Sequence, residues 1–198
     1  MIAKRIFDLL ASGFGLLVLS PVFLLIALSI KLDSPGPVFF RQERVGRFGT
    51  AFRIHKFRTM VTDAEKKGLQ ITVGADARVT RTGAALRKYK LDELAQLIDV
   101  FIGDMSFVGP RPEVPKYVDH YPPEARNIIL AVKPGITDRA SIEYKDENEI
   151  LGRASDPHKA YIEEVLPIKI GYYLDYVKNR SLIGDIRIIF ATLRALAR

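Results

Sequence analysis

The chain has 198 residues, enough for one domain with a hydrophobic core. It contains no cysteine, which excludes disulfides, thiol catalysis and cysteine-ligated metal centres. The formal net charge of +7 favours an anionic partner: a nucleic acid, an anionic bilayer or a phosphorylated substrate. The three histidines, His55, His120 and His158, are too scattered along the chain to predict a metal cluster.

Residues 6–30 form a long apolar segment in which 16 of the 25 residues are Leu, Ile, Phe or Val. These side chains favour insertion into a bilayer by roughly 5–10 kcal/mol. The segment is too long for a signal peptide, and the sequence that follows it, from Lys31, is a poor cleavage context.

A break at Ser20-Pro21 divides this segment into two arms, each too short to span a bilayer as a helix. The Ser20 hydroxyl can bond a carbonyl that the proline leaves free. Either a bent spanning helix or a re-entrant helix hairpin fits the segment. Basic flanks favour the hairpin, because both ends then lie in the cytoplasm; these are Lys4, Arg5, Lys31, Arg41, Arg44 and Arg47. Asp8 lies one turn from Arg5, so either an ion pair with Arg5 or interfacial water would stabilise its carboxylate.

Two β-like runs, residues 38–44 and 51–60, flank a turn at residues 45–49 and predict a β-hairpin. The second run alternates basic and apolar residues. Its basic side chains would line one surface, either for binding or simply in contact with solvent; they are Arg53, His55, Lys56 and Arg58.

Residues 91–103 predict an amphipathic helix that begins with two adjacent carboxylates, Asp92 and Glu93. Its apolar face, from Leu91 to Phe101, should turn inward, and Asp92, Gln96 and Asp99 should share the other side. Neighbouring residues diverge by about 100° around a helix, so the two carboxylates cannot do the same job. Without other information, acidic residues at a helix start simply complement the helix dipole.

The irregular segment after this helix, residues 108–115, contains three prolines and one arginine, Arg111. An arginine held between Pro110 and Pro112 would be a good bidentate phosphate clamp, although the segment could also be a rigid connector. Residues 133–137 predict a second turn. Two helices, over 157–180 and 181–198, should follow, with Ser181 as a cap. The apolar stripe of the last helix could lie on a bilayer, but packing in the core is the simpler expectation.

These motifs together resemble the bacterial sugar transferases, the small monotopic phosphoglycosyl transferases that charge a polyprenyl phosphate. The resemblance covers roughly residues 1–137. It is carried by Lys4-Arg-Ile-Phe-Asp8, Ser20-Pro21, Lys31-Leu-Asp-Ser-Pro-Gly-Pro-Val-Phe-Phe-Arg-Gln42, Lys56-Phe-Arg-Thr-Met60, Leu91-Asp-Glu-Leu-Ala-Gln-Leu97 and Met105-Ser-Phe-Val-Gly-Pro-Arg-Pro112.

The resemblance implies a two-step displacement in which Asp92 attacks the sugar-linked phosphate of a nucleotide-diphosphate sugar. A covalent phosphosugar intermediate forms, and polyprenyl phosphate then takes the phosphosugar. Glu93 is the partner of Asp92. Mg²⁺ is expected at Asp92, with Glu93 as a further ligand. Arg87 and Arg111 are expected to hold phosphates, with Lys56 and Arg58 as weaker candidates.

The resemblance also strengthens the expectation of a re-entrant hairpin. We therefore expect a mostly helical α+β protein with a re-entrant membrane helix over 1–32, broken at Ser20-Pro21. A small β-hairpin and interfacial amphipathic helices would surround a compact catalytic core over 33–198, on the cytoplasmic face of a bacterial inner membrane. The chain lacks the extra transmembrane helices of large family members, so it resembles a minimal catalytic unit.

The sequence after residue 137 departs from the commonest family pattern, so the sugar and the glycan pathway stay open. The expected partners are the nucleotide sugar, the polyprenyl phosphate, the bilayer and downstream glycosyltransferases. A non-catalytic, membrane-anchored basic scaffold is the alternative, and it would have no need for Asp92. A nucleic-acid binder is disfavoured, because the basic residues are dispersed and no known binding motif occurs.

Overall fold

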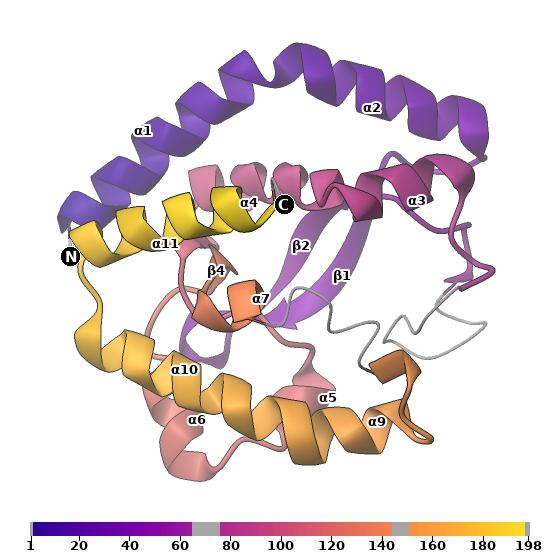
Figure 1. Cartoon of the computed structure of the whole chain (residues 1–198). Coiled ribbons are helices and arrows are strands. Elements are labelled where there is room, and N and C mark those ends of the chain that lie inside the picture. The colour runs from indigo at the N-terminus through magenta and orange to yellow at the C-terminus, as the bar shows by residue number, and fades with distance from the viewer. Residues whose placement is uncertain (1, 65–75, 144–150, 197–198) are drawn as a thin grey trace.

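The computed structural model describes residues 2–64, 76–143 and 151–196. It is a mostly helical α+β fold with two small sheets. The first two helices arch over one side of the molecule, and the long helix α10 crosses the opposite side (Figure 1). The expected fold class is therefore confirmed at the level of secondary structure.

The N-terminal segment forms two helices, α1 (Ile2–Val18) and α2 (Ser20–Asp33), which meet at a bend of 61°. The predicted break is confirmed: Pro21 lies in the first turn of α2, and the Ser20 hydroxyl donates to Leu17 O at 2.8 Å. Among the described helices, none is by itself both long and apolar enough to cross a bilayer; the bent pair is, by length and composition.

Both ends of this bent pair are fastened to the same body of the protein. At the start of α1, Arg5 donates to Val100 O at 2.6 Å and to Phe101 O at 2.9 Å. At the end of α2, Asp33 Oδ2 accepts from Thr82 N at 2.8 Å. The side chains around the bend are largely exposed: Leu10, Phe14, Leu17, Val18, Leu24, Leu25 and Leu28. One side of the apolar middle of the pair therefore lacks protein cover among the described residues, while the other side, which includes Ile26, packs against the body of the protein.

The expected ion pair between Asp8 and Arg5 is wrong, because each side chain has a different partner. Asp8 is buried, and its Oδ1 accepts from Phe107 N at 3.2 Å. Arg5 satisfies the carbonyls at the end of α4 (Gln96–Ile102) instead. The Asp8 carboxylate thus accepts a hydrogen bond from a backbone donor that lies far away in the sequence, and its burial also rules out the alternative of interfacial water.

The predicted β-hairpin is confirmed as strands β1 (Phe39–Val45) and β2 (Ala51–Phe57), which pair antiparallel around the short helix η1 (Arg47–Gly49). The second strand ends earlier than predicted. A second sheet joins β3 (Ser106–Val108) and β4 (Gly135–Thr137) in parallel, so the turn predicted at 133–137 ends in a strand.

Helix α3 (Arg81–Lys88) begins where the Thr80 hydroxyl accepts from Gly83 N at 3.0 Å. The segment after it starts as a 3₁₀ helix, η3 (Leu91–Ala95), and continues as α4 to Gly103, which has a positive φ of 101°. A helix over 91–103 was thus correctly predicted, but its first turn is tighter than an α-helix.

The predicted orientation of this helix is correct only in part: Leu97 is buried and Leu91 and Leu94 pack against a buried apolar cluster, but polar residues expected on the outer side are buried as well. Asp92, Gln96 and Asp99 are buried, whereas Phe101 is 44% exposed. The reason is that β2 supplies polar partners on the inner side: His55 Nδ1 lies 2.6 Å from Asp99 Oδ1. Buried charges are tolerated where such partners exist. Phe101, at the end of the apolar face, turns toward α1, where it lies against Gly13.

Most of the remaining helices form the side opposite the bent pair, and α7 lies between that side and the last helix (Figure 1). These remaining helices are α5 (Pro115–Val118), α6 (Pro123–Ile129), α7 (Arg139–Glu143), α9 (Pro157–Ala160) and α10 (Leu166–Asn179). A π-helical turn, η4 (Tyr161–Val165), lies between α9 and α10, so the helix predicted over 157–180 is present with one irregular turn. The largest buried cluster packs these helices together around Tyr161, Leu166 and Tyr173.

The last helix, α11 (Leu182–Leu196), begins where Ser181 Oγ accepts from Gly184 N at 3.1 Å, as predicted. The expectation that its apolar stripe packs in the core is wrong. Ile183, Phe190 and Leu193 are more than half exposed. The inward side carries polar contacts instead: Thr192 with Thr137 at 2.7 Å, and an ion pair of Asp185 with Lys4.

Candidate active site

The acid pair lies in the first turn of η3, opposite strand β2. Lys90, in the left-handed conformation, turns the chain from α3 into η3. A 3₁₀ helix has three residues per turn, so adjacent side chains point about 120° apart. Asp92 and Glu93 consequently meet different surroundings.

Glu93 is held by two cations. Lys56 Nζ donates to Glu93 Oε1 at 2.9 Å, and Arg111 contacts both carboxylate oxygens with its two terminal nitrogens, at 3.1 Å for Oε2. Burial by itself raises the pKa of Glu93, but Arg111 and Lys56 outweigh it and hold the pKa well below its usual range. Glu93 is therefore an ionised anchor for two cations.

The Asp92 carboxyl differs from that of Glu93 both in its hydrogen bonds and in the direction in which its pKa moves. It is 8% exposed, and its Oδ1 has no hydrogen-bond partner among the described residues. Burial raises the pKa of the Asp92 carboxyl; Lys56 and Arg87 lower it, Glu93 raises it further, and the net direction is upward. A buried polar atom without a partner is costly, which is typical of a group that awaits a ligand.

Arg87 reaches this site from the last turn of α3. Its Nε donates to Thr59 Oγ1 at 3.0 Å, and its charge lowers the pKa of Asp92. Burial lowers the pKa of Arg87 itself, with Asp92 acting against that effect. The predicted phosphate-binding residues Arg87, Lys56 and Arg111 are thus all brought to the acid pair.

Arg58 has other partners. It is 5% exposed, and it donates to Pro35 O at 2.6 Å and to Ser34 O at 2.7 Å, just past the end of α2. These contacts fasten the end of α2 to the segment directly after β2. They give no support to the expectation that Arg58 binds phosphate.

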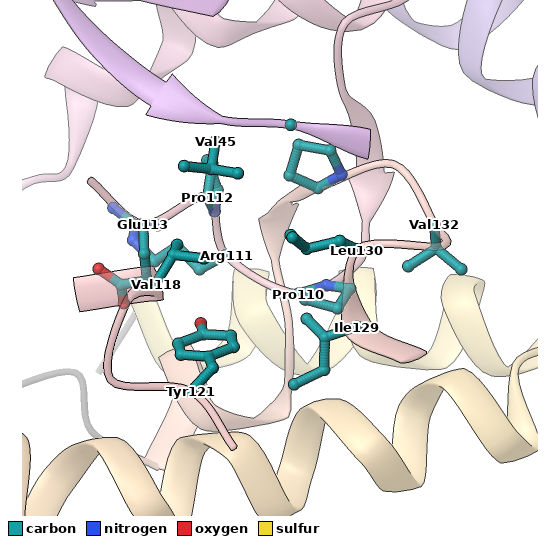
Figure 2. A pocket seen from close by; sticks show the side chains of 12 residues that line it. Val45, Pro110, Arg111, Pro112, Glu113, Val118, Tyr121, Ile129, Leu130 and Val132 are labelled. Atoms are coloured by element: carbon teal, nitrogen blue, oxygen red, sulfur yellow. The ribbon is translucent and has the colours of Figure 1, made fainter. Parts of the chain in front are cut away.

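The loop that carries Arg111 is rigid for reasons visible in its neighbours. Gly109 approaches β4 closely: a Cβ on it would lie 2.5 Å from Lys133 O. Gly109 N also donates to Thr137 O at 3.1 Å, and Arg111 Nη1 donates to Ile136 O at 3.2 Å. Behind the loop lies a mostly apolar pocket, between Val45, the Pro110 and Pro112 rings, and Tyr121 and Ile129 (Figure 2).

The residues of the site also indicate how it could hold a metal ion. The described residues include no group of three or more His, Asp or Glu that could hold one. Mg²⁺ commonly uses only one or two carboxylates and takes its other ligands from water and substrate phosphates. Asp92, with its unpartnered oxygen, fits such a site, whereas Lys56 and Arg111 already occupy Glu93.

Sequence reasoning missed a second layer of buried polar residues. Glu113 lies two residues after Arg111 and contacts Tyr161 and Lys169 of the C-terminal helices. His55 bonds Asp99, and its Nε2 lies 2.5 Å from Arg41 Nη1. The only available signal was a charged residue inside an otherwise rigid or apolar pattern, and that signal does not identify a partner.

Comparison with known proteins identifies the family of this chain. A family model described as bacterial sugar transferase matches residues 1–198. The chain is 40% identical over 195 residues to a UDP-N-acetylgalactosamine-undecaprenyl-phosphate N-acetylgalactosaminephosphotransferase of Aeromonas hydrophila, covering 98% of this chain and 43% of that protein. It is 39% identical over 208 residues to the exopolysaccharide production protein PSS of Rhizobium leguminosarum bv. phaseoli, covering 98% and 94%.

A UDP-glucose:undecaprenyl-phosphate glucose-1-phosphate transferase of Escherichia coli (strain K12) is 37% identical over 193 residues, covering 96% of this chain and 39% of that protein. The chain thus spans less than half of two of these relatives and nearly all of the third. The match extends through the segment after residue 137 that departs from the commonest pattern. The predicted resemblance is confirmed: this chain belongs to the bacterial sugar transferase family.

Proposed function

We propose that this protein transfers a sugar 1-phosphate from a nucleotide-diphosphate sugar, of the UDP-sugar class, to undecaprenyl phosphate or a similar polyprenyl phosphate. The names of the relatives support the reaction type. The observation that carries the proposal for this chain is the buried Asp92, which keeps one carboxylate oxygen without a protein partner beside three cationic side chains. This step would be the first membrane-bound one in building a glycoconjugate.

In the first step, an Asp92 oxygen attacks the phosphorus that bears the sugar. The bond from this phosphorus to the bridging oxygen breaks, and nucleoside monophosphate leaves with that oxygen. A phosphosugar joined to Asp92 as an acyl phosphate remains. A carboxylate attacks an anionic phosphate only when the negative charge is neutralised. Arg111, Lys56 and Arg87 are the side chains that can supply positive charge here.

In the second step, a phosphate oxygen of the polyprenyl phosphate attacks the same phosphorus. The acyl phosphate bond breaks, the Asp92 carboxylate is regenerated and the sugar leaves as a polyprenyl diphosphate. The two carboxylates have separate roles: Asp92 reacts, and Glu93 holds Lys56 and Arg111 near the phosphate position. The Arg111 guanidinium, 26% exposed in its ion pair with Glu93, can still reach a ligand.

Mg²⁺ is part of this proposal: one Asp92 carboxylate oxygen would hold it while the other attacks phosphorus, and Glu93 would become a second ligand only by giving up a contact with Lys56 or Arg111. When bound, it would neutralise charge on the diphosphate. The protein residues would keep their roles beside it. Asp92 supplies the nucleophilic oxygen, and the arginines orient the phosphates.

The proposed setting is the cytoplasmic face of a bacterial inner membrane, with residues 1–32 as a re-entrant hairpin and 33–198 as the catalytic domain. Support comes from the fastening of both ends of the bent pair to one body, while one side of its apolar middle is exposed. The exposed stripe of α11 is suited to lie along the same surface. Downstream glycosyltransferases would then receive the product.

The test uses the full chain in bilayer nanodiscs, with Mg²⁺, undecaprenyl phosphate and a panel of nucleotide sugars. Wild-type protein should release nucleoside monophosphate and, without the acceptor, retain label from a nucleotide sugar labelled in the sugar-linked phosphate. Asp92→Asn should abolish both signals without changing thermal unfolding. Asp104→Asn, at an exposed carboxylate, is the matched control. Turnover by Asp92→Asn would refute the assignment, and inactivity of the wild type on the whole panel would favour the scaffold alternative.

A further inference from the structure

A buried polar cluster connects the Arg111 loop to the C-terminal helices. We call Glu113, Tyr161 and Lys169 the Glu113 cluster. The Tyr161 hydroxyl donates to Glu113 Oε1 at 2.5 Å, and Lys169 Nζ lies 3.5 Å from the same oxygen. Lys169 also donates to the Tyr161 hydroxyl at 3.2 Å. Glu113 is 6% exposed and Lys169 is 4% exposed, so water contributes little to this pair.

The same loop is also attached to the first sheet. Val45 N donates to Glu113 O at 2.9 Å, and Arg44 Nη1 donates to Pro112 O at 2.9 Å. On the other side, Gly135 N donates to Pro110 O at 3.0 Å. Residues on both sides of Arg111 are therefore fixed. Figure 2 shows Glu113 at one end of the pocket, close to Arg111 and Val118.

Stability alone does not explain these buried charges. Burying an ion pair costs several kcal/mol per ion, and well-packed apolar residues are often as stable or more so. The surrounding cluster is apolar and aromatic, so apolar residues would suit the position. Burial raises the pKa of Glu113, but Lys169 and Arg44 outweigh it, so the carboxyl stays ionised. An ion pair differs from an apolar contact in fixing direction as well as distance.

The π-helical turn is a second, independent feature of this contact. Tyr161 is its first residue, and Lys169 lies in α10 directly after it. Such turns are uncommon and occur frequently at functional sites. Here the irregular turn lies where Tyr161 and Lys169 both reach the one carboxylate of Glu113.

We propose that Glu113, Tyr161 and Lys169 are positioning residues for Arg111, so that the π-helical turn η4 and helix α10 form part of the catalytic apparatus through their contact with Glu113, directly after the Pro110–Pro112 loop. This rests on the proposed function, in which Arg111 holds the transferred phosphate. The cluster does not touch the substrate. It fixes the loop backbone so that the Arg111 guanidinium meets both Glu93 and the phosphate.

The test compares Lys169→Met, Glu113→Gln and the double variant with wild type in nanodiscs. Lys169→Met removes the ammonium nearest to the buried Glu113 carboxylate and should lower both the unfolding temperature and kcat. The double variant removes both charges and should regain most of the thermal stability. Its kcat should stay about 10- to 100-fold low, since misplacement by about 1 Å can cost that much, with KM for the nucleotide sugar nearly unchanged. Lys159→Met, at an exposed pair 4.0 Å from Glu163, is the control and should match wild type.

A double-mutant cycle separates positioning from a general structural role. In the Arg111→Lys background, the effect of the double variant on kcat should shrink to about twofold, because residues that act through one group are not additive. Recovery of both stability and kcat in the double variant would overturn the inference, as would full additivity with Arg111→Lys. Wild-type protein that releases no nucleoside monophosphate would instead count against the proposed function.

Discussion

Replacing Arg111 by lysine is the most informative single test of the site. The guanidinium makes two hydrogen bonds to Glu93 and a third to Ile136 O at 3.2 Å. Glu93 also raises the pKa of Arg111, so this cation stays charged at every pH used in an assay. A lysine keeps the charge but cannot form the two parallel bonds of a planar fork.

The magnitude follows from the contacts that lysine loses. Losing one hydrogen bond to a charged group costs about 1.5–3 kcal/mol. If that bond forms mainly in the transition state, this energy is roughly 10- to 150-fold in rate. Arg111→Lys should therefore lower kcat/KM by about one to two orders of magnitude. The loss should fall mainly on kcat, because the contact would strengthen as phosphate charge redistributes.

The assay is steady-state release of nucleoside monophosphate, measured beside a thermal unfolding curve for each variant. Arg126→Lys is the matched control, because Arg126 is 46% exposed and lies 3.9 Å from Asp119 on the surface. The control should behave like wild type. Unchanged kcat/KM in Arg111→Lys, or a loss accounted for entirely by unfolding, would reduce Arg111 to a structural connector.

Three further results are expected. First, because the pKa of Asp92 is raised, the rate at which the covalent adduct forms should fall in acid with an apparent pKa above 3.8. Lys56→Met removes a positive charge that favours the ionised carboxylate, so it should shift this fall in rate to higher pH in single-turnover measurements. An apparent pKa that is unchanged or lower in Lys56→Met would contradict the proposed arrangement of Asp92 and Lys56. Second, cysteines placed just before α1 and just after α2 should be labelled from one side of a bilayer, and Pro21→Ala, which restores a backbone donor, should increase labelling from opposite sides. Third, brominated lipids should quench the fluorescence of a dye attached to Phe190→Cys, because Phe190 is 67% exposed on an apolar stripe of α11. The control is a dye on the exposed Glu124→Cys in α6, whose fluorescence should not be quenched. Equal quenching of the two dyes would argue against α11 lying on the bilayer.

Local signals in the sequence predicted much of the architecture. A proline after serine predicted the bend between α1 and α2, since proline cannot donate a helical hydrogen bond. Alternation and a glycine-containing turn predicted the first hairpin. The family resemblance, rather than a local signal, predicted the acid pair as site residues, and the fold brings Glu93 and Arg111, 18 residues apart, into contact. The bend and the hairpin each depend on residues that are near one another in the sequence.

The predictions that were wrong concern contacts between segments that are far apart in the sequence. Lys56 and Glu93 are 37 residues apart, and His55 and Asp99 are 44 apart. Helical periodicity correctly predicted that Leu97 is buried, but it did not predict that Asp99 on the polar side is buried too, because that depends on the donors that β2 presents. The stripe of α11 was misassigned for a related reason. A stripe on a bilayer and a stripe in a core have the same period, and only the fold tells which surface covers it.

The two adjacent carboxylates show how environment divides one pattern into two roles. Sequence reasoning required only that Asp92 and Glu93 differ, because a helix turns them apart. The fold then brings Lys56 from β2 and Arg111 from the Pro110–Pro112 loop to Glu93, and the pKa of Glu93 falls. Asp92 is left buried with one unpartnered oxygen and a raised pKa. Carboxylates whose pKa values are pushed apart commonly take separate roles in catalysis. In the proposed mechanism, Glu93 therefore anchors the cations, and Asp92 is the carboxylate assigned to attack phosphorus.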